Sequence, residues 1–195
     1  LPADFKEYRD FMCGTDDYMA GQVAAQTLMT AFPDGCNVVE IGGQSGHDAQ
    51  IKRHDGFVDT IEGTNINLLD SQDCAAWASD DAQAIAEDFI VKYGDEIDAI
   101  YCHWDIGATG IIQALKTAGI QGVYVIGVDG CKVGYDQVRE GTQALSIGQS
   151  FSQMTQDAFG CITQILNGEE APDVVWTALD VVTAETIDNF PYPEW

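Results

Sequence analysis

The stretch Val123-Tyr-Val-Ile-Gly-Val-Asp-Gly130 decides the fold, because a run of apolar, mostly β-branched residues stops there at an acid and a glycine. An apolar run of this length, closed by a turn signal, is typical of a strand buried inside a parallel sheet. In open α/β sheets, ligands bind just beyond the carboxyl ends of such strands. We therefore expect Asp129 to lie where a polar ligand can be held.

Strand-like and helix-like segments alternate on both sides of this stretch. Strands are expected at residues 37–41, 66–69, 99–103, 123–128, 144–148 and 174–179, and helices at 18–32, 48–60, 75–93, 108–118, 132–140 and 151–166. This alternation predicts an α/β fold, a three-layer parallel sheet flanked by helices. It also predicts one compact lobe at residues 15–149, followed by a helix, a strand and a tail at 150–195.

The composition favours a neutral small-molecule ligand. The chain has 8 basic and 32 acidic residues, which gives a formal net charge of −24. Such a surface repels nucleic-acid phosphates and anionic lipids, so neither is an expected partner. Solubility is the simplest explanation of the acidity. No stretch is long and apolar enough to span a membrane.

The cysteines and histidines do not indicate a metal site or an active site. None of the six cysteines forms a CxxC pair or clusters with histidine at zinc-like spacing, so no metal and no cofactor are expected. The cysteines are interpreted as small buried residues, and a disulfide between Cys102 and Cys131 stays open. Because the chain has no nucleophile elbow, and nothing positive points to a pair of glycosidase carboxylates, an enzyme is not expected.

A glycine-rich turn at residues 42–46 follows one predicted strand. It is neither a dinucleotide fingerprint nor a P-loop, so a turn that faces a ligand through Gln44 is favoured over a phosphate cradle. Arg53 follows in the next predicted helix. Its guanidinium suits paired hydroxyls or a carboxylate, and the alternative is a surface salt bridge with Asp48 or Asp55.

Two tryptophans lie near the carboxyl ends of predicted strands. Trp77 is expected to open the helix at residues 75–93, and Trp104 directly follows the strand at 99–103. Both are either ordinary core residues or a clamp for the apolar faces of a sugar ring. Asp16, Asp105 and Asp129 also lie at strand-to-helix corners, where each either caps the next helix or faces a ligand.

Five segments resemble, in the same order and spacing, motifs of type 1 periplasmic binding proteins of the ribose-binding kind. They are Gly14-Thr-Asp-Asp-Tyr-Met-Ala-Gly21, Arg53-His-Asp-Gly-Phe57, Trp104-Asp-Ile-Gly-Ala-Thr-Gly110 with Gln113-Ala-Leu115, Ile126-Gly-Val-Asp-Gly130 and Ala144-Leu-Ser-Ile-Gly-Gln149. The resemblance covers nearly the whole chain. It implies the carboxyl-terminal lobe of a two-lobed protein, in which residues 1–14 are the hinge and the end of a missing amino-terminal lobe.

The resemblance also implies a function and a site. An extracytoplasmic solute-binding protein would deliver a small neutral ligand, a mono- or small saccharide, to an ABC permease. It would lie in the periplasm or be anchored as a lipoprotein on the outer cell surface. The implied ligand contacts are Gln44, Arg53, Trp77, Trp104, Asp129 and Gln149. Trp104 stands where the family pattern usually has Asn, which replaces a polar contact with a flat apolar wall.

Two other roles of the same fold stay open. One is the ligand-sensing domain of a sugar-responsive transcriptional regulator, against which the net charge of −24 argues, and the other is a sensing domain of a membrane receptor. The resemblance implies that the helix at residues 151–166 returns to the missing lobe, so without that lobe its apolar face predicts dimerisation. A single lobe also predicts weak or absent sugar binding by this chain alone.

Overall fold

The computed structural model describes residues 7–195, so residues 1–6 of the expected hinge lie outside the described part. The chain forms two compact units. Unit 1 comprises residues 7–16 and 149–180, and unit 2 comprises residues 17–148 and 181–195.

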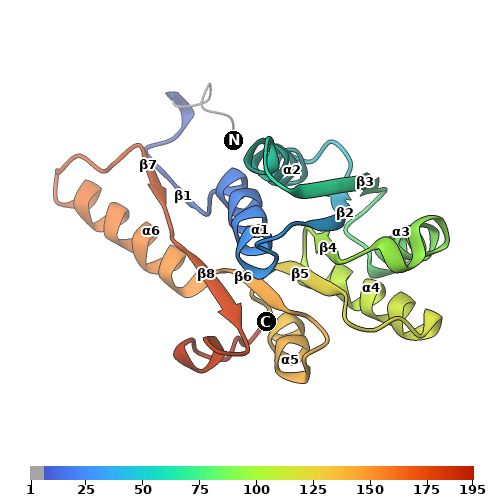
Figure 1. Cartoon of the computed structure of the whole chain (residues 1–195). Helices are drawn as coiled ribbons and strands as arrows, with labels where there is room; N and C mark the ends of the chain where they lie inside the picture. Colours follow the sequence, from blue (N-terminus) through green and yellow to red (C-terminus); the bar gives the residue numbers. More distant parts are fainter. Residues whose placement is uncertain (1–6) are drawn as a thin grey trace. The chain divides into compact units, whose positions relative to one another are not determined.

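A six-stranded sheet forms the centre of unit 2 (Figure 1). Its strands are β2 (Cys36–Gln44), β3 (Ile66–Cys74), β4 (Ala99–Cys102), β5 (Tyr124–Asp129), β6 (Leu145–Gln149) and β8 (Leu179–Thr183), in the spatial order β3-β2-β4-β5-β6-β8. The pairs from β3 to β6 are parallel. This confirms the predicted parallel α/β sheet.

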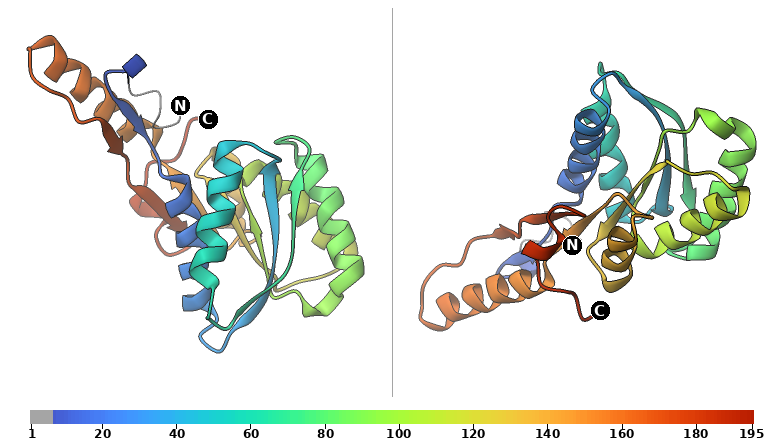
Figure 2. Two further views of the ribbon diagram at one scale, coloured as in Figure 1. Left: turned by 90° about the horizontal axis from the view of Figure 1, so that it is seen from above. Right: turned by 60° about the horizontal axis from the view of Figure 1, so that its bottom comes forward.

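Helices cover both faces of this sheet (Figure 2). On one face α1 (Asp17–Ala31) packs against α2 (Asp48–Ile61), and on the other α3 (Ser79–Tyr93) packs against α4 (Asp105–Ala118), which α5 (Lys132–Glu140) also contacts. The larger core cluster lies between the sheet and the pair α3 and α4, and it contains Ile100, Ile111 and Phe89. Burying these apolar helix faces on both sides of the sheet produces the predicted three layers.

Two glycines set the position of α2. A Cβ atom on Gly21 of α1 would collide with the backbone of Arg53, and one on Gly56 of α2 would collide with the backbone of Tyr18. Only residues without a side chain let the two helix backbones approach this closely. The close crossing brings Asp17, the first residue of α1, beside Arg53.

Unit 1 holds a small sheet and one helix. Strand β1 (Met12–Gly14) pairs in parallel with β7 (Val174–Trp176), and Cys13 stands opposite Val175. Helix α6 (Phe151–Leu166) packs against β1. The strands are short, and α6 buries little of its surface in this chain.

Several predicted boundaries were wrong. The strand expected at residues 174–179 is two strands, because β7 pairs with β1 whereas β8 joins the large sheet beside β6. The helix expected from residue 75 begins at Ser79, so Trp77 lies in the preceding loop. Strand β2 continues through the glycines to Gln44, and β3 continues to Cys74, because glycines and polar residues near the ends of these strands break the apolar pattern of a buried strand.

The disulfide left open between Cys102 and Cys131 is absent, since both residues are free thiols.

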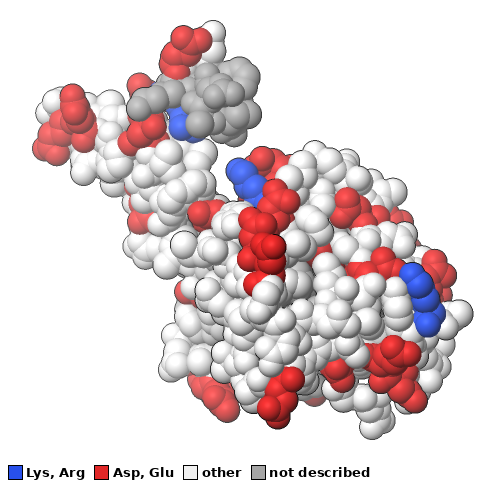
Figure 3. All heavy atoms as spheres, turned by 45° about the horizontal axis from the view of Figure 1, so that its top comes forward, with Lys and Arg blue, Asp and Glu red and all other residues white. Residues whose placement is uncertain are grey.

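Acidic side chains are scattered over the face drawn in Figure 3, and basic ones are few there. Within residues 7–195, no helix combines the length and apolar character that crossing a membrane requires.

Candidate functional site

Polar and aromatic side chains gather at the carboxyl edge of the sheet in unit 2. Gln44 ends β2, Trp104 lies two residues after the end of β4, and Asp129 ends β5. The loop after β3 adds Trp77, and α2 adds Arg53. Because neighbouring parallel strands end at one edge, these residues of different segments all lie there.

Arg53 is the central charge of this edge. Its side chain is only 4% exposed, and its Nε donates to Oδ1 of Asp17 at 2.8 Å. Its Nη1 lies 3.8 Å from Oδ1 of Asp129 and also donates to the carbonyl of His103. The alternative of a surface salt bridge with Asp48 or Asp55 is wrong, because Arg53 is buried and its side chain contacts residues of other elements. These contacts fix one guanidinium orientation.

Trp77 rests on the glycine-rich turn. A Cβ on Gly43 would collide with the Trp77 ring, so that glycine makes room for an aromatic side chain. The ring meets Trp104 edge-on, with centroids 5.3 Å apart and planes at 86°, and it meets His47 in the same way at 5.5 Å. The Cζ of Arg53 lies 5.9 Å from its centroid. The turn therefore supports an aromatic wall beside a fixed cation.

Trp104 lies deeper than Trp77. It is 4% exposed, belongs to the main core cluster and packs its ring against Gly107. Its indole Nε1 is buried and has no hydrogen-bond partner among the described residues. Trp104 thus supports the Trp77 ring from behind, and its contact with a ligand stays a prediction.

Asp129 occupies a strained backbone conformation at the end of β5. Its φ is 124°, the only positive φ of a described non-glycine residue, and Gly130 follows with φ 71°. Non-glycine residues in this region are uncommon, persist only where surrounding contacts enforce them, and cluster at functional sites. The strain turns the chain sharply where the Asp129 carboxylate faces Arg53.

Asp105 stabilises that turn through hydrogen bonds. Its Oδ2 accepts hydrogen bonds from the backbone N–H groups of Gly130, at 2.9 Å, and Cys131, at 3.2 Å, and from the Ser146 hydroxyl at 2.7 Å. Gln143 donates to its other oxygen at 2.8 Å. The side chain is fully buried, and burial raises its pKa to about 6. Asp105 therefore organises the β5 turn rather than capping its own helix.

A second buried network lies beside Arg53, and it was not predicted. Glu40 of β2 contacts Nδ1 of His54 at 2.6 Å and Nε2 of His103 at 2.9 Å, and it accepts from Ser71 at 2.7 Å. Burial alone would raise the pKa of Glu40, but these hydrogen bonds lower it to about 2. The hydrogen bond to Glu40 raises the pKa of His54, whereas burial lowers that of His103.

This network reinforces two residues of the edge. His54 follows Arg53 in α2, and His103 precedes Trp104 after β4, so Glu40 ties both backbones to the sheet. A sequence signal existed, because Glu40 interrupts the apolar run Val38-Val39-Glu40-Ile41. Within residues 7–195, no group of histidine, cysteine and acidic side chains is placed to hold a metal ion.

A model of the periplasmic binding protein domain matches residues 3–170. The chain belongs to this family. The ribose import binding protein RbsB of Escherichia coli K12 is 27% identical over 156 residues, which cover 80% of this chain and 52% of that protein. The xylitol-binding protein of Mycolicibacterium smegmatis is 27% identical over 177 residues, 89% of this chain and 50% of that protein. This family member thus spans about half the length of these relatives.

A solved structure shares the same architecture. The periplasmic solute-binding protein of an ABC transporter from Actinobacillus succinogenes, crystallised with bound D-allose, matches with a TM-score of 0.84 at 25% identity. The match covers 92% of this chain and 63% of that chain. The fold of this family member is therefore that of a type 1 periplasmic binding protein.

Gln149, the remaining expected contact, ends β6 and belongs to unit 1. There its Oε1 accepts a hydrogen bond of 2.6 Å from the Thr15 hydroxyl. The two residues lie at the points where the chain leaves and re-enters unit 1, so this bond joins those two connections. Its contact with a ligand stays a prediction.

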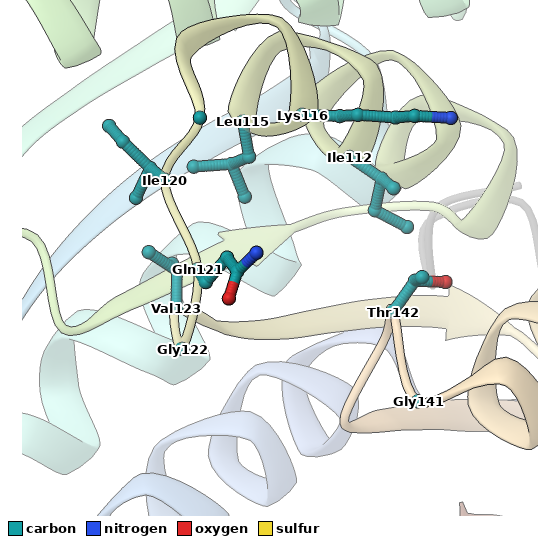
Figure 4. A pocket seen from close by; sticks show the side chains of 10 residues that line it. Ile112, Leu115, Lys116, Ile120, Gln121, Gly122, Val123, Gly141 and Thr142 are labelled. Atoms are coloured by element: carbon teal, nitrogen blue, oxygen red, sulfur yellow. The ribbon is translucent and has the colours of Figure 1, made fainter.

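A cavity of about 310 Å³ lies at the opposite edge of the sheet (Figure 4). It is lined by the end of α4, including Leu115 and Lys116, and by the loops that precede β5 and β6, including Gln121 and Thr142. None of the expected contact residues lines it. Because the amino ends of parallel strands seldom hold ligands in this fold class, we assign no ligand to it.

Proposed function

We propose that the chain forms the carboxyl-terminal ligand-binding half of an extracytoplasmic protein that delivers a small neutral saccharide to an ABC permease. The observation that carries this proposal is the arrangement of Arg53, Asp129 and Trp77. A fixed guanidinium and a carboxylate offer directional hydrogen bonds to sugar hydroxyls, and the indole offers a flat surface for the ring. The bound sugars named for its relatives, ribose, xylitol and allose, are all neutral polyols.

In this proposal a second lobe completes the cleft, and Gln149 contacts the ligand near the hinge. A ligand held between two lobes stabilises the closed form, because only that form contacts it from both sides. The permease would recognise the closed form. The protein would lie in the periplasm or be lipid-anchored on the outer cell surface. This role needs no catalytic group. The chain alone offers one wall, so its own affinity for sugar is expected to be weak.

Tryptophan fluorescence tests the proposal. The chain is titrated with D-ribose, D-allose and xylitol, and with ribose 5-phosphate as an anionic comparison. A saturable change is expected for at least one neutral polyol, and the net charge of −24 should weaken the response to the phosphate. The Asp129→Ala and Trp77→Ala variants should each lose the response, because each removes part of the site.

Two matched variants control for general damage. Asp95→Ala removes an exposed carboxylate near the amino edge of the sheet, and Trp195→Ala removes an exposed indole from the tail. Both should leave the titration unchanged. Equal losses in the site variants and the control variants would contradict the proposed site.

A further inference from the structure

Two cysteines of unit 1 come from segments that are far apart in the sequence. Cys13 is the central residue of β1, and Cys161 is the one residue of α6 that the chain buries. Helix α6 packs against β1, and both views of Figure 2 show the two elements side by side. Each cysteine is a free thiol in the structure.

A chain of contacts brings β1 and α6 together close to the two cysteines. The Gly14 carbonyl accepts a hydrogen bond of 2.8 Å from the Thr177 N–H, and the Thr177 hydroxyl donates to Asp157 of α6 at 2.7 Å. Cys161 lies one helical turn beyond Asp157 on the same face of α6. Cys13 directly precedes Gly14 in β1, so this face of α6 meets β1 at Cys13. Consistently, burial and then a hydrogen bond with Cys161 raise the pKa of Cys13 to about 11.

Access distinguishes this pair from the cysteines of unit 2. Cys74 and Cys102 are completely enclosed by the core, and the Cys102 thiol donates to the Trp104 carbonyl at 3.2 Å. Cys13 is only partly buried whereas Cys161 is buried, so we expect an oxidant to react first at Cys13. One accessible thiol beside one buried thiol is the arrangement that favours intramolecular disulfide formation.

We propose that Cys13 and Cys161 form a disulfide when the protein meets a disulfide oxidant, such as oxidised glutathione or an exported thiol–disulfide oxidoreductase. The Cys13 thiolate attacks one sulfur of the oxidant, which forms a mixed disulfide and releases one thiolate. Cys161, after losing its proton, attacks the Cys13 sulfur, forms the Cys13–Cys161 bond and releases the second thiolate. Two electrons pass to the oxidant, and the protons of the two cysteines end on the released thiols.

The bond would close a loop that contains residues 17–148, the larger part of unit 2. It would tie together the chain segments on either side of that loop and restrict the unfolded ensemble of unit 1. The inference does not depend on the sugar-binding proposal, because neither cysteine belongs to the candidate site. Oxidising compartments outside the cytoplasm are where such bonds persist.

Peptide mapping tests the inference directly. The folded 195-residue chain is incubated with oxidised glutathione at pH 8 and pH 9, alkylated and digested with trypsin. The sparse basic residues leave peptides 10–52 and 140–195, of which the second contains only Cys161 and the first contains Cys13 and Cys36. We expect these two peptides to be linked, with a mass loss of two hydrogens. The linkage should form faster at pH 9, because the raised pKa of Cys13 leaves little thiolate at neutral pH.

Variants assign the bond and its effect. Cys13→Ser and Cys161→Ser should each abolish the linked peptide, whereas Cys36→Ala should retain it. Oxidation should raise the melting temperature of the chain and of Cys36→Ala, and should leave the two serine variants unchanged. All six cysteines remaining alkylatable after prolonged oxidation, or a linkage that survives Cys13→Ser, would overturn the proposal.

Discussion

Helices α4 and α6 show how differently the two units use an apolar helix. In α4, Ala108, Ile111 and Ala114 are buried against the sheet. In α6, Phe159 is 64% exposed and Leu166 is 81% exposed, although the helix has a comparable share of apolar residues. The comparison teaches that unit 2 covers the apolar faces of its helices within the chain, whereas α6 leaves most of its apolar side chains exposed.

A matched pair of truncations tests, with the largest expected effect, whether α4 is better packed than α6. Ile111→Ala in α4 should lower the free energy of unfolding by about 2–5 kcal/mol, because it leaves a cavity in a closed core. Ile162→Ala in α6 should change it by less than about 0.5 kcal/mol, because its side chain already meets solvent. Urea unfolding measures both. Similar losses in the two variants would show that α6 is as well packed as α4.

A second pair of variants compares a fully buried carboxylate with a partly exposed one. Asp105→Ala should destabilise unit 2 by about 2 kcal/mol, since it strands buried backbone donors at Gly130 and Cys131. Asp157→Ala removes a partly exposed acid of α6 that accepts from Thr177, and a smaller loss is expected. Thermal unfolding at pH 7 measures which of the two variants loses more stability. The account fails if Asp157→Ala proves the more damaging variant.

Self-association of the chain tests whether the exposed apolar residues of α6 form an interface. We expect the chain to associate through α6 in a concentration-dependent way, because Phe159 and Leu166 expose apolar area. The double variant Phe159→Ser, Leu166→Ser should shift sedimentation velocity profiles toward the monomer without loss of stability. Val91→Ser, which removes an equally exposed apolar residue from α3, is the control and should leave association unchanged. A monomer at every concentration would contradict this expectation.

The smallest expected effect concerns pH. All three histidines belong to unit 2, and Glu40 raises the pKa of His54 above its ordinary value of 6.5. A raised histidine pKa contributes stability that is complete below the unfolded value and is lost as pH rises through the folded value. Hydrogen exchange in unit 2 should therefore quicken as pH rises above about 6.5, after correction for intrinsic rates. His54→Gln should flatten this dependence, and an unchanged profile in that variant would exclude His54 as its source.

Unit 2 was largely predictable from local patterns. Buried parallel strands such as Val123–Val128 appear as apolar runs, and helix ends such as Gly119 appear as glycines. Strand β8 was missed because its identity depends on pairing with β6, a contact that no local pattern encodes. The polar end of β3 was missed for a related reason, since an edge strand exposes one side to solvent.

The candidate site was predictable in its position more than in its construction. The edge residues follow strand ends, so Gln44, Trp104 and Asp129 could be placed from the sequence. The partners that hold them could not, because Asp17 reaches Arg53 across a helix crossing, and Glu40 reaches His103 across the sheet. Such contacts join residues distant in the sequence, and only the fold brings them together.

The most direct test of the central claim uses the side-chain indole signals of the four tryptophans. Two of them, Trp77 and Trp104, meet edge-on at the candidate site, and Trp176 and Trp195 lie elsewhere. In a nitrogen-15 correlation spectrum, titration with millimolar neutral sugar should shift the indole N–H signals of Trp77 and Trp104 and leave the other two in place. Shifts confined to Trp176 and Trp195, or no shift with any neutral polyol, would contradict a sugar site at the carboxyl edge of this sheet.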